Sequence, residues 1–208
     1  MKKFRESHPI RTADVAEEND YHKYLPQLTK DFNGRCGYTD SSHVYWGVKF
    51  QIDHFAPLKP DVKENKKQAF KDGELNYYNL VYACPQVNRA KWNDWASDSP
   101  TTPILNDKGY YDPCTEDFND HFYRTDGGGI MPKAGDVVAE YMWSKLKLYL
   151  KRYELYWRID ILKEKQAHLS DISHKIDDDT EILRLIRDFG DEIRKYENYL
   201  DLNKNSIA

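Results

Sequence analysis

The sequence predicts an α+β fold in which short strands come first and two long helices come last. Residues 43–52 and 77–84 are rich in β-branched and aromatic side chains, which favour strands. Residues 121–131 place a Gly-rich turn between two short strand-like runs, a pattern typical of a β-hairpin. From residue 136 onward, apolar side chains recur every three or four positions, as on an amphipathic helix.

The composition is that of a globular protein of mixed charge. The 208 residues are 39% apolar, which is enough for a core. The net charge of -4 argues against a large non-specific nucleic-acid-binding surface but allows a local basic groove. Three cysteines indicate a reduced intracellular protein rather than a disulfide scaffold. Because we find no secretory signal and no bilayer-spanning apolar run, we expect a soluble, cytoplasmic protein without a membrane partner.

The first forty residues predict an arm, a helix and a series of turns. Residues 1–20 are polar and mixed in charge, so they predict an arm with little structure of its own. Apolar side chains at helical spacing predict a helix over residues 20–32, which Pro26 interrupts or restarts. The turn-rich run over residues 33–40, which we call the knuckle, follows this helix.

A strand, a long loop, a second strand and a helix come next. The first strand-forming run covers residues 43–52. Residues 55–75 predict a long, lysine-rich loop, and such loops in compact domains are usually functional or mobile. Residues 77–84 predict an apolar strand, and Pro85 begins a predicted helix that runs to about Trp95.

The second half predicts a hairpin and two long helices. The run Asp-Gly-Gly-Gly at residues 126–129 joins short strands at 121–125 and 130–131. Amphipathic spacing predicts helices over residues 136–168 and 180–202. The expected divisions are an N-terminal arm, a domain of strands and short helices, and a C-terminal helical region, at residues 1–20, 21–132 and 133–208.

Three polar side chains lie where this order of elements brings them together. A strand ending in Asp53-His54 is placed beside the first turns of the following helix, where Asn88 lies. A carboxylate and an amide oxygen, completed by water and phosphate, suit Mg²⁺ or a similar divalent ion. Because side chains alternate along a strand, His54 points away from Asp53 and can accept a proton from water. The structural alternatives are a hydrogen-bonded His54 and a helix-capping Asn88.

This linked set resembles the HNH, or ββα-metal, family of nucleases. In that family an Asp-His pair comes from the first strand, an Asn from the second, and a His or Asn from the helix. The matching residues here are Asp53, His54, Asn79 and Asn88. The flanking patterns that also match are Phe55-x-Pro57, Asn79-Leu80 and Asn88-x-x-Lys91.

The resemblance implies a ββα-metal core and a metal-dependent endonuclease that hydrolyses phosphodiester bonds. DNA is the expected substrate, and an RNase of the same fold is an alternative. His54 would be the general base, and Asn79 would fix the backbone and orientation of His54. Asp53 and Asn88 would hold one Mg²⁺ (or Mn²⁺) ion that stabilises the scissile phosphate.

The resemblance also implies contacts between basic side chains and nucleic acid. Arg89 and Lys91 would reach phosphate from the exposed side of the helix, with ordinary solvated charges as the alternative. The lysines of the predicted loop, including Lys66 and Lys67, would clamp a strand or simply be solvated.

One feature departs from the family. Many HNH proteins bind a structural zinc through two Cys-x-x-Cys pairs, and the pairs here read Cys36-x-x-Thr39 and Cys84-x-x-Val87. No structural zinc is expected, because these pairs cannot form a four-thiolate site. A zinc site from both cysteines, Cys114 and a His is an alternative that the spacing does not demand. The lost cysteines also support a rival function, a catalytically weak or dead HNH scaffold that acts as a nucleic-acid- or protein-binding adaptor.

The second half is similar to stand-alone HNH proteins of bacterial anti-phage systems, including the nuclease subunit that accompanies an ATPase in Septu-type and some retron-linked systems. The residues that carry this similarity are Tyr111-Asp112-Pro113, His121-Phe122-Tyr123, the Gly-rich hairpin, Leu146-x-Leu148 and Arg152. It implies that the C-terminal helices dock a partner ATPase or a second copy of the chain. The apolar seam from Ile182 to Leu200 supports docking, although a helical hairpin explains the seam more simply.

Overall fold

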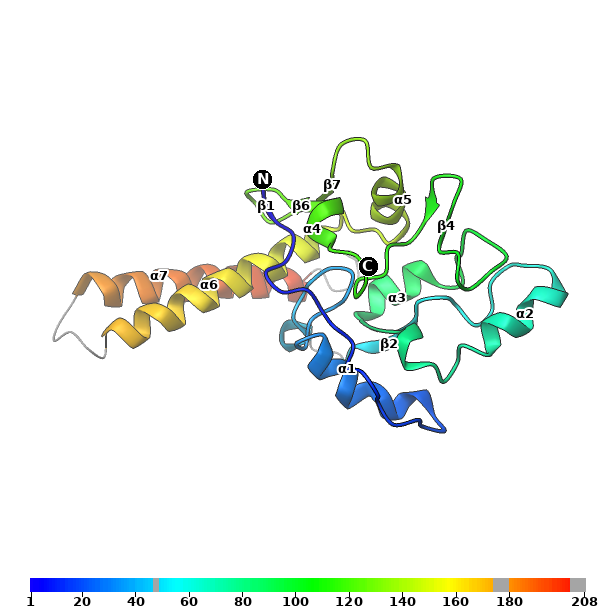
Figure 1. The fold of residues 1–208 in the computed structure, drawn as a ribbon. Coiled ribbons are helices and arrows are strands. Elements are labelled where there is room, and N and C mark those ends of the chain that lie inside the picture. The colour runs from blue at the N-terminus through cyan, green and yellow to red at the C-terminus, as the bar shows by residue number, and fades with distance from the viewer. Residues whose placement is uncertain (47–48, 174–179, 203–208) are drawn as a thin grey trace. The chain divides into compact units, whose positions relative to one another are not determined.

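Small antiparallel sheets and short helices make up the first part of the chain, and two long helices make up the last (Figure 1). The computed structural model describes residues 1–46, 49–173 and 180–202. The chain divides into two units, Met1–Tyr149 and Leu150–Ala208. The predicted mixed α+β class is confirmed.

The first unit contains a two-stranded sheet followed directly by a helix. Strand β2 (Gln51–His54) pairs antiparallel with β3 (Leu80–Ala83), so that His54 lies opposite Leu80. Every residue of β3 is buried, which explains its apolar sequence. Helix α3 (Pro85–Lys91) starts two residues after β3, with Pro85 in its first turn. Helix α1 (Leu25–Asp31), which follows the short helix η1 (Tyr21–Tyr24), packs on β3.

The N-terminal arm contains one short strand, and the residues that follow this strand are buried in the first unit. Strand β1 (Lys2–Lys3) pairs with β6 (Phe122–Arg124), which also pairs with β7 (Ile130–Pro132). Phe4 is 1% exposed and packs against Phe118 and Phe122, at ring-centroid distances of 5.7 and 5.8 Å. The polar composition of the arm did not reveal these partners because they lie more than a hundred residues away.

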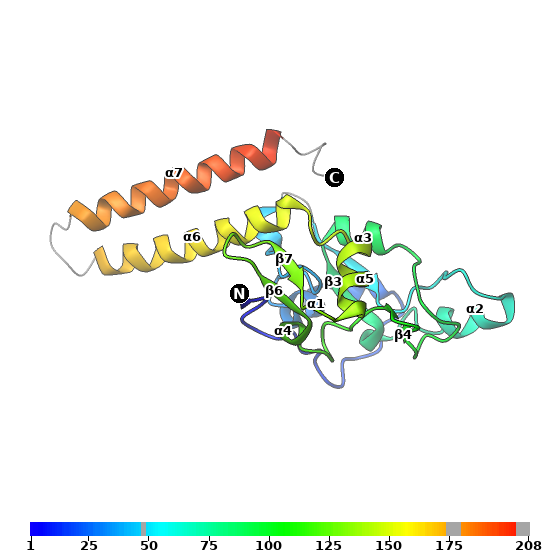
Figure 2. The same ribbon diagram turned by 90° about the horizontal axis from the view of Figure 1, so that it is seen from above.

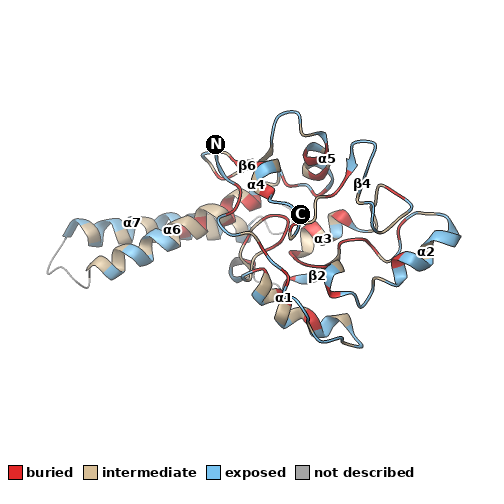
Figure 3. Ribbon diagram, in the orientation of Figure 1, coloured by how far each residue is buried: buried red, intermediate tan, exposed pale blue. Residues whose placement is uncertain are grey.

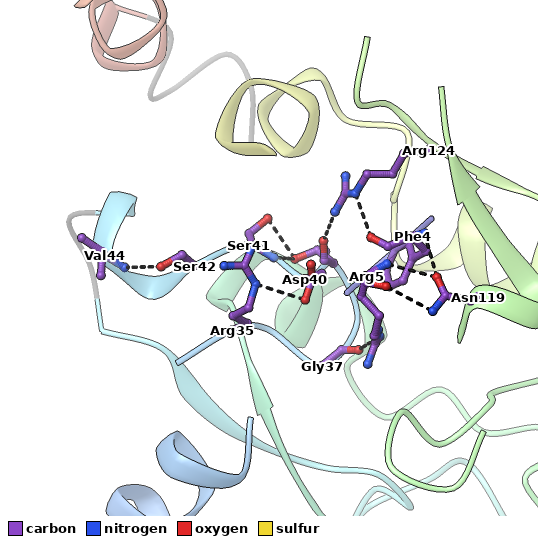
Figure 4. A network of polar contacts seen from close by, with 11 residues as sticks. Phe4, Arg5, Arg35, Gly37, Asp40, Ser41, Ser42, Val44, Asn119 and Arg124 are labelled. Atoms are coloured by element: carbon purple, nitrogen blue, oxygen red, sulfur yellow. Dashed lines mark hydrogen bonds and ion pairs between the residues drawn. The ribbon is translucent and has the colours of Figure 1, made fainter. Parts of the chain in front are cut away.

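Two buried arginines join the arm and β6 to the knuckle (Figure 4). The Arg124 guanidinium donates hydrogen bonds to the carbonyl oxygens of Phe4, Gly128 and Thr39, at 3.0, 2.8 and 2.7 Å. Arg5 donates through Nη2 to the Gly37 carbonyl at 2.6 Å. The knuckle is therefore held by side chains that come from elements distant in sequence.

The segment before β2 and the loop after it both differ from expectation. Residues 43–45 form a short helix, η2 (His43–Tyr45), and regular pairing starts only at Gln51. The predicted long loop contains helix α2 (Glu64–Lys71), which lies at an edge of the first unit in both views (Figures 1 and 2). Phe70 anchors α2 at 0% exposure, while the rest of the helix is largely exposed (Figure 3). A single apolar anchor in a charged helix leaves little periodicity to detect.

A hairpin precedes the predicted one. Strands β4 (Ile104–Leu105) and β5 (Lys108–Gly109) pair through a turn in which both central residues have positive φ. The predicted hairpin at the Asp-Gly-Gly-Gly turn is confirmed as β6 and β7, and helix α4 (Phe118–His121) leads into it.

The predicted helix over residues 136–168 is two helices. Helix α5 (Val137–Lys145) ends before Lys147, which has a φ of 54°, and α6 (Lys151–Ser173) then begins. Helix α5 belongs to the first unit, where Trp143 donates to the Ile130 carbonyl at 2.6 Å. The first unit thus extends to residue 149, beyond the expected boundary at 132. Apolar residues continue through the break, so periodicity alone did not reveal it.

The expected C-terminal helical hairpin is confirmed. Helix α7 (Thr180–Leu202) lies along α6. The pair is joined by an ion pair between Lys163 and Glu197 at 2.8 Å, and Gln166 donates to the Ile186 carbonyl at 2.9 Å. Across the described residues, no helix is both long enough and apolar enough to cross a membrane.

Candidate functional site

A cleft of about 390 Å³ lies between the end of β2 and helix α3. Its walls bring together Asp53, His54 and Asn88, three of the four residues of the sequence motif. The other residues that line it are Gln51, Ile52, Pro57, Leu58, Lys59, Pro85, Arg89, Trp92 and Asn93. We call this the candidate cleft.

The Asp53 carboxylate is buried and accepts hydrogen bonds from two sides. Lys91 Nζ lies 3.0 Å from Oδ1, and the Tyr38 hydroxyl donates to Oδ2 at 2.6 Å. Burial raises the pKa of Asp53 above its ordinary value, and the Lys91 charge opposes that rise. Asp53 therefore joins the knuckle and α3 as well as lining the cleft.

Lys91 is not on the exposed side of α3, so its expected role as a phosphate contact is wrong. It is 0% exposed, and its ammonium also donates to the His54 carbonyl at 2.8 Å. Lys91 follows Val87 by four residues, which puts both side chains on the buried face of the helix. The sequence pattern alone gave no indication that a lysine would occupy this apolar face.

The His54 imidazole has a defined tautomer and orientation. Its Nε2 atom lies 3.0 Å from the Glu74 carbonyl oxygen. A carbonyl oxygen only accepts hydrogen bonds, so Nε2 carries the proton and Nδ1 keeps a lone pair. The ring packs against that of Tyr21 in a T-shaped arrangement, with a centroid distance of 4.7 Å. Burial lowers the pKa of His54 below its ordinary value of 6.5, which keeps the imidazole neutral near pH 7.

His54 and Asp53 have different neighbours, as alternation along a strand predicts. Asp53 faces Tyr38 and Lys91, whereas His54 faces Tyr21 and Glu74. Both nevertheless line the candidate cleft, because they lie at the end of β2.

Asn79 holds the chain that follows His54, although it lies outside the cleft lining. It belongs to the short helix η3 (Tyr77–Asn79) immediately before β3, not to the strand where we expected it. Its Oδ1 accepts from the Ala56 N–H at 2.8 Å, and its Nδ2 donates to the carbonyls of Ala56 and Gly73, at 3.0 and 3.2 Å. Asn79 thus ties the backbone two residues after His54 to the segment that carries the Glu74 carbonyl.

Asn88 faces the cleft and does not cap α3. The residue at the helix N-cap is Cys84, four positions earlier. The Asn88 amide donates to Gln51 Oε1 at 2.9 Å. The sequence did not single out Gln51, because an exposed Gln on a strand has no distinctive pattern.

The predicted basic contacts divide into two groups. Arg89 is exposed and lines the candidate cleft, where the structure adds Lys59. Lys66 and Lys67 lie on α2 and are not among the lining residues, and Lys67 is paired with Glu64 at 2.7 Å. The local basic wall is therefore Lys59 and Arg89.

The two cysteines left from the zinc pairs are neighbours in the core. The Cys84 N–H donates to Cys36 Sγ at 3.3 Å, and both thiols are buried and free. In the part of the chain that the structure describes, no group of three or more His, Cys, Asp or Glu side chains is arranged to hold a metal. The knuckle is held by the contacts of Arg5 and Arg124 described above.

Comparison with known proteins adds no family assignment. No protein-family model, no curated protein and no solved structure matches this chain.

Proposed function

We propose that this protein is a metal-dependent endonuclease of HNH type that hydrolyses phosphodiester bonds, with DNA as its substrate. The observation that carries the proposal is the candidate cleft itself. An imidazole with an available lone pair, a carboxylate and an amide line one cleft on a β-β-α unit, with two cations on its wall. This combination of groups is suited to the activation of water beside a bound phosphate.

The donor set fits a hard divalent ion. Asp53 and Asn88 offer oxygens to the same cleft, and each Asp53 oxygen accepts one hydrogen bond and so keeps a second lone pair. Lys91 pairs with the same carboxylate, so a metal would bind weakly there and millimolar concentrations would be needed to fill the site. A bound Mg²⁺ or Mn²⁺ would stabilise charge on the phosphate.

The chain's own residues would activate the attacking water and position the substrate. His54 Nδ1 would take the proton of the attacking water, while the Glu74 carbonyl holds Nε2–H and so fixes the tautomer. Asn79 fixes the backbone next to His54 through its bonds to Ala56. Lys59 and Arg89 would bind the flanking phosphates.

Replacement of His54 tests the proposal. In a plasmid-nicking assay with Mg²⁺ or Mn²⁺, we expect His54→Ala to cleave about 10²–10⁴-fold more slowly, the usual loss for a general base. His168→Ala, which removes an exposed histidine on α6, serves as the matched control and should cleave normally. Equal rates for His54→Ala and the unmodified chain would rule out His54 as the base.

The pH dependence of cleavage gives a separate prediction. Only neutral His54 can accept a proton, so the rate should rise with pH through the pKa of this residue. Because burial lowers that pKa, the midpoint of kcat/KM should fall below 6.5, with a plateau at neutral pH. A midpoint above 6.5 would contradict the assignment.

The adaptor remains the rival function, and metal binding separates the two. A working site should raise the thermal unfolding temperature in millimolar Mn²⁺, and Asn88→Ala should remove the shift. Asn88 is preferable to Asp53 as the altered ligand, because Asp53 also supports the core. If the protein shows no metal-dependent shift and cleaves neither DNA nor RNA, the adaptor is favoured.

A role in anti-phage defence, with α6 and α7 docking an ATPase or a second copy, stays a prediction from the resemblance.

A further inference from the structure

The residue that ends α3 has an unusual backbone conformation. Trp92 has φ 50° and ψ -128°, and its N–H closes the helix by donating to the Asn88 carbonyl at 3.0 Å. The Asp94 N–H donates to the Lys91 carbonyl, also at 3.0 Å, so residues 91–94 form a β-turn. These angles are those of the first central position of a type II′ turn, which favours glycine. A tryptophan there is strained.

The Trp92 side chain is also unusually exposed. It keeps 72% of its surface accessible, whereas Trp95, three residues later, packs on Phe55 with a centroid distance of 5.4 Å. Neither backbone preference nor core packing accounts for a tryptophan at position 92. Strained residues concentrate at functional sites, and tryptophan is enriched where proteins contact their partners.

The surroundings of Trp92 indicate the chemistry of its partner. Trp92 lines the candidate cleft together with His54, Lys59 and Arg89. An aromatic face beside cations that bind phosphate is the arrangement by which proteins hold single-stranded nucleic acid, with one base stacked on the ring. A protein partner would use the aromatic surface but would give no reason for Lys59 and Arg89 to share the wall with His54.

We infer that Trp92 is a nucleobase-stacking subsite, and that it selects an unpaired nucleotide next to the scissile phosphate. This inference rests on the proposed function, because it takes the phosphate position from the candidate cleft. A base inside a duplex is already stacked on both neighbours, so its face is not available to the indole. The preferred substrate is therefore a single strand, or a duplex whose base is unpaired at the cut.

Oligonucleotide binding tests the subsite. Binding is measured by fluorescence anisotropy in Mg²⁺, on a His54→Ala background that prevents cleavage. The two probes are an oligothymidine and an abasic strand of the same length, which carries the same phosphates without bases. Trp92→Ala should weaken oligothymidine binding about tenfold and leave abasic binding unchanged, while Trp92→Phe should keep most of the affinity.

Trp92→Gly separates the role of the side chain from a folding defect. Glycine suits the observed φ, so this variant should unfold at the same temperature or higher and still lose the preference for bases. Equal losses on both probes, no loss, or no binding of oligothymidine by the His54→Ala parent would each overturn the inference. Cleavage that depends on His54 without a base preference would overturn this inference alone. Base-dependent binding without cleavage would overturn only the proposed nuclease.

Discussion

Lys91→Met should lower the free energy of unfolding by about 3–5 kcal/mol at pH 7, because it leaves a buried carboxylate without its counter-ion. The Lys91–Asp53 pair has side-chain exposures of 0% and 4%, and Lys91 also bonds the His54 carbonyl. Methionine has a similar volume and removes only the charge and the hydrogen bonds. Urea unfolding followed by tryptophan fluorescence measures the loss.

Two comparisons assign that loss to the unpaired Asp53 charge. The cost should shrink at acidic pH, where protonation neutralises Asp53 in the variant. Adding Asp53→Asn should recover part of the stability, since the amide carries no charge. Arg89→Met, an exposed change on the same helix, should stay within about 0.5 kcal/mol of the unmodified chain. A penalty that is independent of pH would mean that packing around Lys91, not the ion pair, carries the stability.

Arg124→Met should destabilise the first unit by about 3 kcal/mol or more. Arg124 is 0% exposed and satisfies three carbonyl oxygens, and each carbonyl left without a donor in the core costs roughly 1–3 kcal/mol. Arg124→Lys should recover only part of the loss, because an ammonium lacks the planar fork that reaches three acceptors.

Hydrogen exchange can show where Arg124 acts. Its partners Phe4 and Thr39 lie in the arm and the knuckle, so Arg124→Met should speed amide exchange in residues 1–11 and 35–41. Lys133→Met, an exposed change next to β7, is the control and should leave these amides protected. Unchanged exchange in both segments would show that other contacts hold the arm.

The contacts of Arg124 and Lys91 also support the candidate cleft. Arg124 holds Thr39, and the neighbouring Tyr38 donates its hydroxyl to Asp53. Lys91 fixes the same carboxylate from α3. Buried cations bonded to backbone and carboxylate oxygens thus help to hold the walls of the candidate cleft.

The sequence by itself determined the local order of the candidate site. Strand alternation placed Asp53 and His54 against different neighbours, and Pro85 set the start of α3 so that Asn88 faces the end of β2. The Asp-Gly-Gly-Gly turn likewise fixed the β6–β7 hairpin. These features follow from dihedral preferences and side-chain periodicity over a few residues, which a sequence displays directly.

Only the tertiary structure decided what those local patterns contact. The start of the arm is held because Arg124 donates a hydrogen bond to the Phe4 carbonyl, 120 residues earlier in the chain. Lys91 can be buried because its ammonium pairs with the Asp53 carboxylate. The strain at Trp92 arises because the chain must reverse after α3, although its sequence offers no glycine there. Each depends on a partner or a chain path set far away, and polar residue identity alone does not reveal whether burial will be compensated.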